Sequence, residues 1–221
     1  MESFDNMQTL IRSSGFRAWI ENSLATQENV LATSNQGTLL LYEKNGSPLV
    51  IKSAMGPPLL YRVRLATLRR EYAAYQRLEG LAGIPVCHGM IDGLYLVMDY
   101  VDGTSYRETE WSDREGWFTE FLALVQQIHD RGVAHGDLKS KSNIIVTADQ
   151  RPCIIDFGTA ILRKDGFHPL NKRFFEYSRR LDLNAWVKHK YHGRYQDVAE
   201  DDQKYLNYSW LEKILRSYRP S

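Results

Sequence analysis

The sequence predicts an α+β fold with two lobes, in which a strand-rich first half precedes a helix-rich second half. Residues 29–55 alternate short apolar runs with turn residues, and Asn45-Gly46 is a strong hairpin signal. Beyond Gly103 the apolar residues recur at helical spacing instead. A chain of 221 residues is long enough to bury a core as one domain or as two closely associated lobes.

The first half is predicted to form an antiparallel sheet that carries one major helix. Its expected strands are 30–33, 38–42, 48–52, 86–90 and 94–100. Residues 65–81 have the apolar spacing of an amphipathic helix, which Gly83 and Pro85 should end. In the second half, Ser112 and Glu115 resemble a capping box that starts a helix ending near Gly132. Further expected elements are short strands at 143–146 and 153–155 and helices near 172–188 and 203–218.

The expected organisation is an N-terminal extension (1–27), a first lobe (28–98) and a short helical second lobe (99–221). Residues 7–24 are amphipathic, with a membrane surface as one possible partner. We expect them to contact the protein itself, in a helix that Ser13-Ser14-Gly15 interrupts.

The composition, with 43% hydrophobic and 25% charged residues, argues against disorder, and a net charge of +1 does not indicate nucleic-acid binding. Cys87 and Cys153 have no metal-ligand or disulfide pattern, so buried thiols in a reducing cytoplasm are expected. No apolar run approaches the ~20 residues of a membrane-spanning helix. The N-terminus lacks an apolar signal core, so we expect neither an integral membrane segment nor secretion.

Two clusters carry the chemistry: 135–143, which contains His135-Gly136-Asp137, and 154–158, which contains Asp156-Phe157-Gly158. Phosphoryl transfer needs cations that neutralise phosphate charge and a carboxylate that orients the acceptor hydroxyl. Both clusters offer carboxylates on loops beside short predicted strands. We therefore expect Asp156 and Asn143 to bind Mg²⁺ and Asp137 to orient, or accept the proton of, a hydroxyl acceptor.

These two segments resemble the catalytic loop and the Asp-Phe-Gly motif of the protein-kinase-like superfamily. His-Gly-Asp in place of His-Arg-Asp is similar to the small atypical kinases: the RIO kinases, the kinase of the KEOPS complex and the Kdo/WaaP-type lipopolysaccharide kinases. The resemblance covers roughly residues 28–190, in order. It implies a two-lobe kinase-like fold that binds ATP and Mg²⁺ in the cleft between the lobes.

The resemblance also implies roles for other residues. Lys52, in a segment similar to the third-strand Val-Ala-Ile-Lys motif, should contact the α- and β-phosphates, and Glu71 should hold its ammonium. Ser34 and Gly37 flank the expected phosphate-covering turn. Lys139 is the expected catalytic-loop lysine, with Lys141 as an open alternative. The expected adenine-binding hinge consists of Met98, Asp99 and Tyr100.

The sequence departs from the family pattern in three places. Gly-x-Gly-x-x-Gly is absent, one extra residue separates Asp137 from Asn143, and no Ala-Pro-Glu follows Asp156. Asp182 can be interpreted in two ways: as a residue that braces the catalytic loop, or as a surface charge. The pairs 172–173 and 179–180 are expected to be a solvated basic helix face, with an anionic-substrate patch as the alternative.

The function expected from these observations is an ATP- and Mg²⁺-dependent kinase of the atypical type. Its acceptor would be a hydroxyl group, either Ser/Thr of a protein or a sugar of lipopolysaccharide type, and a protein partner remains possible. Two alternatives stay open: a pseudokinase, and an ATPase switch that acts as the nucleotide-binding subunit of a complex.

Overall fold

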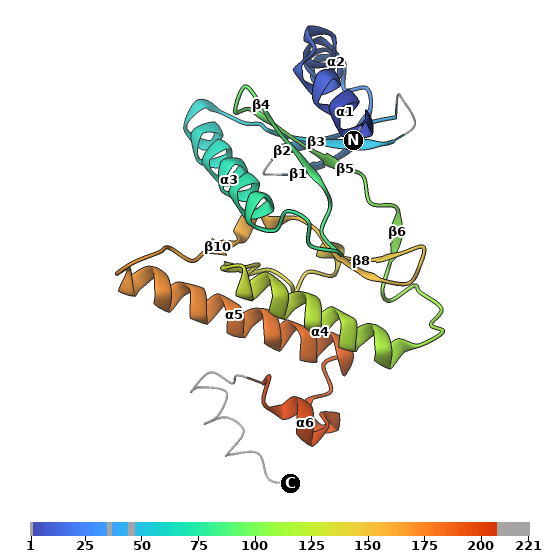
Figure 1. Cartoon of the computed structure of the whole chain (residues 1–221), viewed down its shortest axis with the longest axis vertical. Coiled ribbons are helices and arrows are strands. Elements are labelled where there is room, and N and C mark those ends of the chain that lie inside the picture. Colours follow the sequence, from blue (N-terminus) through green and yellow to red (C-terminus); the bar gives the residue numbers. More distant parts are fainter. Residues whose placement is uncertain (1, 35–36, 44–46, 207–221) are drawn as a thin grey trace.

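The computed structural model describes residues 2–34, 37–43 and 47–206 and has two lobes, a sheet with helices above a mainly helical lobe (Figure 1). Several predicted features lie outside the described residues. These are Asn35-Gln36 in the expected phosphate-covering turn, the hairpin signal Asn45-Gly46, and most of the helix predicted at 203–218. Within the described residues, no helix combines the length and the hydropathy needed to cross a bilayer.

The first lobe contains a five-stranded antiparallel sheet with strand order β1-β2-β3-β5-β4. Its strands are β1 (Val30–Ser34), β2 (Gly37–Tyr42), β3 (Leu49–Ala54), β4 (Cys87–Ile91) and β5 (Tyr95–Asp99). All five predicted strands are present, with ends shifted by one or two residues. Consecutive side chains point to opposite faces of a strand, so Val50 and Lys52 face the interlobe cavity while Leu49 and Ile51 are buried on the other face.

The single major helix of this lobe is α3 (Pro58–Arg77), which lies beside β3 and β4. It begins seven residues before the predicted start, because Pro58 occupies the first helical turn, where the missing backbone N–H has no helical partner to lose. It ends at Arg77, earlier than the predicted stop at 81.

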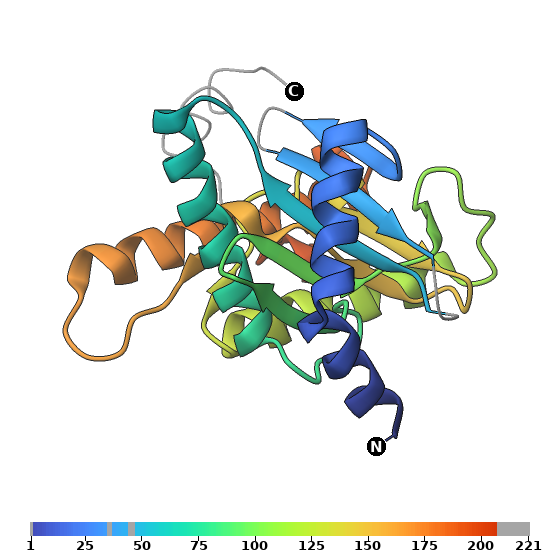
Figure 2. The same cartoon turned by 90° about the horizontal axis from the view of Figure 1, so that it is seen from above.

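Two helices, α1 (Glu2–Arg12) and α2 (Ser14–Thr26), cover the face of the sheet turned away from the second lobe (Figures 1 and 2). The helix interruption expected at Ser13 is confirmed, because the Ser13 hydroxyl caps α2 by accepting from the Phe16 amide at 3.1 Å. Phe16 and Ile20 are buried against Leu40 and Ile51. The N-terminal segment therefore contacts the protein itself, as expected.

The second lobe is built on two adjacent helices, α4 (Arg114–Asp130) and α5 (Pro169–Lys190). The predicted cap of α4 is wrong by one residue: Asp113 accepts from the Gly116 amide at 2.8 Å, while the Ser112 hydroxyl donates to Gln150 at 2.6 Å. Short strands form two small sheets above these helices. They are β6 (Gly103–Ser105), β7 (Val133–Ala134), β8 (Ile144–Thr147), β9 (Pro152–Ile154) and β10 (Ile161–Leu162), paired as β6-β8-β9 and β7-β10.

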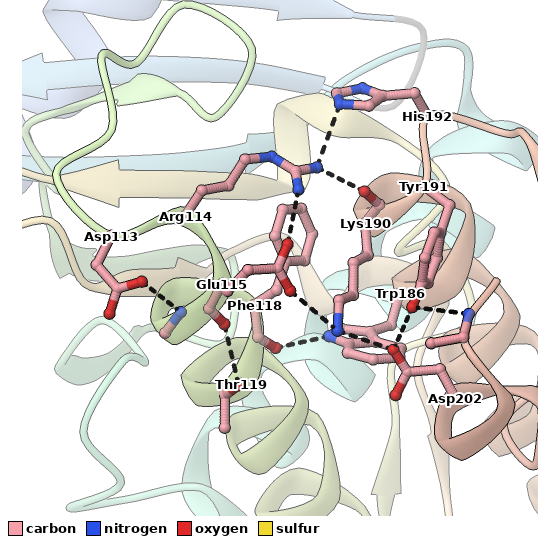
Figure 3. A network of polar contacts seen from close by, with 12 residues as sticks. Asp113, Arg114, Glu115, Phe118, Thr119, Trp186, Lys190, Tyr191, His192 and Asp202 are labelled. Atoms are coloured by element: carbon pink, nitrogen blue, oxygen red, sulfur yellow. Dashed lines mark hydrogen bonds and ion pairs between the residues drawn. The ribbon is translucent and has the colours of Figure 1, made fainter. Parts of the chain in front are cut away.

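A polar network joins the start of α4 to the end of α5 (Figure 3). Lys190 lies 3.3 Å from Glu115 and 2.8 Å from Asp202, next to the short helix α6 (Glu200–Gln203). The Trp186 indole N–H donates to the Phe118 carbonyl at 2.8 Å. These contacts fix the end of α5 that supports the catalytic loop described below.

A substitution at Ile20 tests whether the N-terminal helices contribute to the stability of the fold. Replacing this fully buried side chain by alanine leaves a cavity under the sheet. Ile20→Ala should therefore lower the free energy of unfolding by about 2–5 kcal/mol, measured by urea denaturation. Exposed Asn22→Ala on the same helix is the control and should change it by less than about 0.5 kcal/mol. Equal stability of the two variants would contradict the described contact.

Candidate active site

The centre of the site is Lys52, which connects three elements. Its Nζ lies 3.0 Å from Glu71 Oε1 and 2.8 Å from Glu71 Oε2 on α3. The same Nζ lies 2.7 Å from Asp156 Oδ1 in the second lobe. Glu71 is almost fully buried, whereas the Asp156 side chain is 44% exposed. One lysine thus holds a buried carboxylate on one side and a carboxylate open to the cavity on the other.

The pKa values of the three groups follow from burial and mutual charge. Burial alone would lower the pKa of Lys52, but the two carboxylates outweigh it and the pKa lies above its ordinary value. Burial raises the pKa of Glu71, and Lys52 offsets this only in part. Burial raises the pKa of Asp156, but the charge and hydrogen bond of Lys52 outweigh burial and leave this pKa below its ordinary value. Lys52 and Asp156 are therefore held in their charged forms.

The backbone at Asp156 has φ of 62°, a left-handed conformation that aspartate tolerates better than most residues. Its side chain accepts from the Gly158 amide at 3.3 Å and caps the short 3₁₀ helix Phe157–Thr159. Phe157 is fully buried between the rings of Tyr75 on α3 and His135 in the catalytic loop. The aromatic contact therefore sets the position of the second cluster against both lobes.

Asp182 on α5 braces the catalytic loop. Its two carboxylate oxygens accept from the backbone amides of His135 and Gly136, both at 2.8 Å. The His129 ring, the histidine of α4 that faces α5, lies 3.0 Å from Asp182 Oδ2. Asp182 is 1% exposed, so of the two readings left open by the sequence, the brace is the one the structure shows.

The structure explains why position 136 is a glycine. Its φ is 80°, which disfavours any side chain, and a Cβ there would lie 3.0 Å from Ser178 Oγ and 3.2 Å from the Thr159 carbonyl. Gly37 is required for a different reason, since a Cβ would lie 2.0 Å from the Ser53 carbonyl of the neighbouring strand. Both glycines permit close backbone approach at the site.

The additional residue between Asp137 and Asn143 is accommodated in a 3₁₀ turn, Lys141–Asn143. The Ser140 amide donates to the Asp137 carbonyl at 3.2 Å, and the Asn143 amide donates to the Ser140 carbonyl at 3.3 Å. The Asn143 side-chain Nδ2 then donates to the Asp137 carbonyl at 3.1 Å, which turns its Oδ1 away from that bond. The loop thus keeps Asp137 and Asn143 connected despite its extra length.

A cavity of about 710 Å³ lies between the lobes. Nine of the eleven predicted site residues line it: Ser34, Gly37, Lys52, Glu71, Met98, Asp99, Tyr100, Asn143 and Asp156. The other two, Asp137 and Lys139, belong to the loop beside it and are not part of its wall. Sequence reasoning missed the apolar part of the wall, which comes from residues such as Leu31, Val50 and Ile145 on three separate strands and Ile155 just after β9.

The predicted hinge is already partly hydrogen bonded. The Asp99 and Tyr100 amides donate to the carbonyls of Val86 and Pro48, at 2.9 Å and 3.0 Å. The Asp99 carboxylate lies 2.7 Å from His88 Nε2. An adenine edge at this segment would therefore bond to other backbone groups than these two amides.

Sequence reasoning also missed a second support of the catalytic loop. His189, near the end of α5, lies 2.7 Å from the Leu138 carbonyl through Nε2 and 2.6 Å from the Tyr106 hydroxyl through Nδ1. Burial lowers the pKa of His189 to about 4, so the ring is neutral at pH 7. The neutral ring donates from Nε2 and accepts at Nδ1. Its spacing of seven residues from Asp182, two turns along one helix face, is the sequence signal that could have revealed it.

The residues at the cavity fit Mg²⁺. Carboxylate and amide oxygens are hard ligands of the type that Mg²⁺ prefers, and this ion commonly uses one or two protein ligands plus phosphate and water oxygens. Asp156 has an exposed, ionised carboxylate and Asn143 has an amide oxygen on the same wall. No cluster of three or more His, Cys, Asp or Glu side chains suited to a metal exists in the part of the chain that the structure describes.

Two solved structures with a similar architecture are of a RIO kinase. The Rio2 kinase of Chaetomium thermophilum, in an ADP/Mg²⁺-phosphoaspartate complex, matches with a TM-score of 0.54 at 18% identity over 89% of this chain and 69% of that one. A second Rio2 structure from the same organism matches with a TM-score of 0.53, also at 18% identity. The chain has a protein-kinase-like fold. The predicted two-lobe fold is confirmed, and the sequence matches described next confirm the resemblance to protein kinases.

The sequence is similar to protein kinases over shorter stretches. Calcium-dependent protein kinase 12 of Oryza sativa subsp. japonica is 27% identical over 158 residues, 65% of this chain and 30% of that protein. Casein kinase I homolog 2 of Schizosaccharomyces pombe is 29% identical over 136 residues, 55% of this chain and 31% of that protein. The matches thus span less than a third of these curated relatives. No family model matches the chain.

Asp182→Asn tests the brace. The amide keeps the size of the carboxylate but offers one acceptor oxygen to two backbone donors, so one buried N–H loses its partner. The free energy of unfolding should fall by about 3 kcal/mol, measured by urea denaturation. Exposed Asp130→Asn on α4 is the matched control and should stay within about 0.5 kcal/mol of the parent. A similarly small effect of Asp182→Asn would show that the brace does not support the fold.

His189 makes stability depend on pH. The unfolded imidazole titrates near 6.5 and the folded one near 4, so the folded state binds fewer protons between these values. The stabilisation is therefore complete above pH 6.5 and is lost as the pH falls toward 4. Between these limits the parent should lose roughly 3 kcal/mol more than His189→Gln, which cannot titrate. Parallel pH profiles of the two proteins in urea denaturation would rule out this linkage.

Proposed function

We propose that the protein is an ATP- and Mg²⁺-dependent phosphotransferase of the atypical kinase type. The observation that carries the proposal is the contact of Lys52 with both Glu71 and Asp156 at a cavity that Asn143 also lines. A partly buried lysine held by a helix glutamate beside an exposed aspartate is the arrangement that phosphate and metal binding require in kinases. The fold alone would not support this activity.

In this proposal Lys52 binds the α- and β-phosphates, and Glu71 keeps its ammonium in place. When bound, Mg²⁺ would neutralise phosphate charge, with Asp156 and Asn143 as its protein ligands. The backbone near Met98, Asp99 and Tyr100 receives the adenine. Ser34 and Gly37 line the cavity on the side assigned to the phosphates, and the lack of a side chain at Gly37 lets β2 lie close to β3.

The transfer step needs little covalent help from the protein. The acceptor oxygen forms a bond to the γ-phosphorus as the bond from that phosphorus to the β–γ bridging oxygen breaks, and ADP leaves. Asp137 orients the acceptor hydroxyl and takes its proton. The brace from Asp182 acts on the two amides that precede Asp137, and so fixes the direction of this carboxylate.

Cations beside the catalytic loop favour an acceptor that carries negative charge. Lys139 and Lys141 belong to the loop, Arg107 follows Tyr106, and Lys188 precedes His189. The hydrogen bonds that connect Tyr106, His189 and Leu138 bring these segments together. Desolvation, and then the charges of Arg107 and Lys188, lower the pKa of Lys141, in agreement with their proximity. An acidic or phosphorylated Ser/Thr segment and an anionic sugar both fit this charge, and Lys139 is the cation we assign to the transferred group.

The test is incubation of the purified chain with γ-labelled ATP and Mg²⁺, following label on protein and free phosphate together. Asp137→Asn and Asp156→Ala should each reduce total turnover at least 100-fold, because one removes the proton acceptor and the other a metal ligand. Asp130→Asn should retain full turnover. Label that survives hydroxylamine indicates a Ser/Thr ester, whereas loss indicates an acyl phosphate, the chemistry of the phosphoaspartate in the Rio2 complex.

Other outcomes separate the alternatives. Free phosphate without labelled protein, with the same sensitivity to both substitutions, favours the ATPase switch. If ATP·Mg²⁺ raises the melting temperature without any turnover, the pseudokinase is favoured. Absence of both turnover and thermal stabilisation by ATP·Mg²⁺ would contradict the proposal.

A further inference from the structure

The first half of α5 and the loop before it expose a series of large apolar side chains. Their exposed fractions are 91% for Phe167, 72% for Leu170, 62% for Phe174, 62% for Tyr177 and 39% for Leu181. Isolated exposed apolar residues are ordinary, but a contiguous set of this kind marks an interaction surface. We call these five residues the α5 stripe. It plays no part in the site described above.

The stripe is one of three parallel rows along the helix. Positions four, seven and eleven residues apart share a helix face, so Leu170, Phe174, Tyr177 and Leu181 form one line. The residues immediately after Phe174 and Leu181 are Phe175 and Asp182, which are buried against the protein. The residues immediately before them are Arg173 and Arg180, which are exposed. The order across the helix surface is therefore buried, exposed apolar, and cationic.

The charge around the stripe is strongly positive. Residues 163–181 contain six Lys or Arg and two acidic residues, although the whole chain has a net charge of only +1. One of the two acids, Glu176, forms an ion pair with Arg179 at 3.1 Å. Among the residues that the structure describes, no carboxylate forms an ion pair with Arg173 or Arg180. These two guanidinium groups are available to an anionic partner.

The position of the stripe suits a flat partner. In Figure 2 the first half of α5 and its preceding loop, in orange, extend outward beyond the rest of the described fold. A projecting convex helix edge can enter the headgroup region of a bilayer with its apolar row, while cations at its border meet anionic headgroups. Docking between proteins more often uses an aromatic anchor in a complementary pocket. The convex shape of this part of α5 and its positive charge together favour a lipid surface as the partner of the stripe.

The stripe also lies close to the catalytic loop. Ser178 follows Tyr177 and lies close to Gly136, the residue before Asp137: a Cβ at Gly136 would lie 3.0 Å from Ser178 Oγ. A surface bound along the stripe would thus lie near the loop that carries Asp137.

We propose that the α5 stripe, with Arg173 and Arg180 at its border, docks the protein on the surface of an anionic lipid bilayer. Phe167, Leu170 and Phe174 enter the interface, and the two arginines contact acidic headgroups. Binding is peripheral and reversible, and it does not depend on whether the cavity transfers phosphate. Failure of the proposed activity and failure of this docking are therefore separate results.

The test is co-sedimentation of the full chain with vesicles of phosphatidylcholine alone or of phosphatidylcholine with 30% phosphatidylglycerol, without nucleotide. The parent should bind the anionic vesicles at least tenfold more strongly than the neutral ones, and rising salt should weaken this binding. Leu170→Ser/Phe174→Ser should reduce binding at least tenfold through loss of buried apolar area. Arg173→Gln/Arg180→Gln should reduce it roughly 30-fold, at about 1 kcal/mol for each cation near the surface.

The matched control is Arg62→Gln/Val63→Ser on α3, which removes one exposed cation and one apolar side chain that is 61% exposed. This variant should bind as the parent does, and all variants should melt as the parent does. The proposal is overturned if the parent ignores anionic vesicles, or if the α5 variants and the control bind alike. Lipid-free sedimentation that shows a dimer abolished by Phe174→Ser would instead assign the stripe to a second copy of the chain.

Discussion

The structure of the site depends on one constraint: a charge removed from water must find an opposite charge nearby. Glu71 is almost fully buried on α3, and among the described residues the Lys52 ammonium is the cation that pairs with it. Because Lys52 also contacts Asp156, the sheet, α3 and the second lobe meet at a single nitrogen. Phe157, buried between Tyr75 and His135, adds an apolar contact at the same junction. Polar and apolar interactions thus hold the lobes in one relative position.

The catalytic loop shows how a short segment gains rigidity without a long strand or helix of its own. Two groups on one face of α5, Asp182 and His189, hold opposite ends of residues 135–138. Asp182 accepts hydrogen bonds from two backbone amides at one end of the loop, and His189 donates one to a backbone carbonyl at the other end. Backbone donors and acceptors of the loop are thus both paired. The contacts of Trp186 and Lys190 in turn fix the end of α5 that carries His189. Helix α5 is therefore the support of a loop that lies outside it.

Much of the fold could be predicted because its signals are local. Strand alternation and the 3.6-residue period placed the sheet of the first lobe and the main helices, with errors at their ends, where capping decides, as at Asp113 and Pro58. The short strands β6, β7 and β10 were not predicted. The pairing of Lys52 with Glu71 was predictable from motif spacing. The apolar cavity wall was not, because it gathers ordinary core residue types from distant parts of the chain. The His189 contacts were not either, because they join residues 51 and 83 positions apart. Asp182 stayed ambiguous for the same reason, since burial is not visible in a single sequence.

The contact between Lys52 and Asp156 has a consequence for the order in which ligands enter the cavity. With Lys52 between two carboxylates, the trio carries a net charge of −1 when Glu71 is ionised, so a polyphosphate without a counterion meets repulsion rather than attraction. In the proposed function Asp156 would hold a divalent ion in place of the Lys52 ammonium, and the net charge of the site would then become positive. The resting pocket would then act as an electrostatic filter that admits the chelated nucleotide and discriminates against the free one.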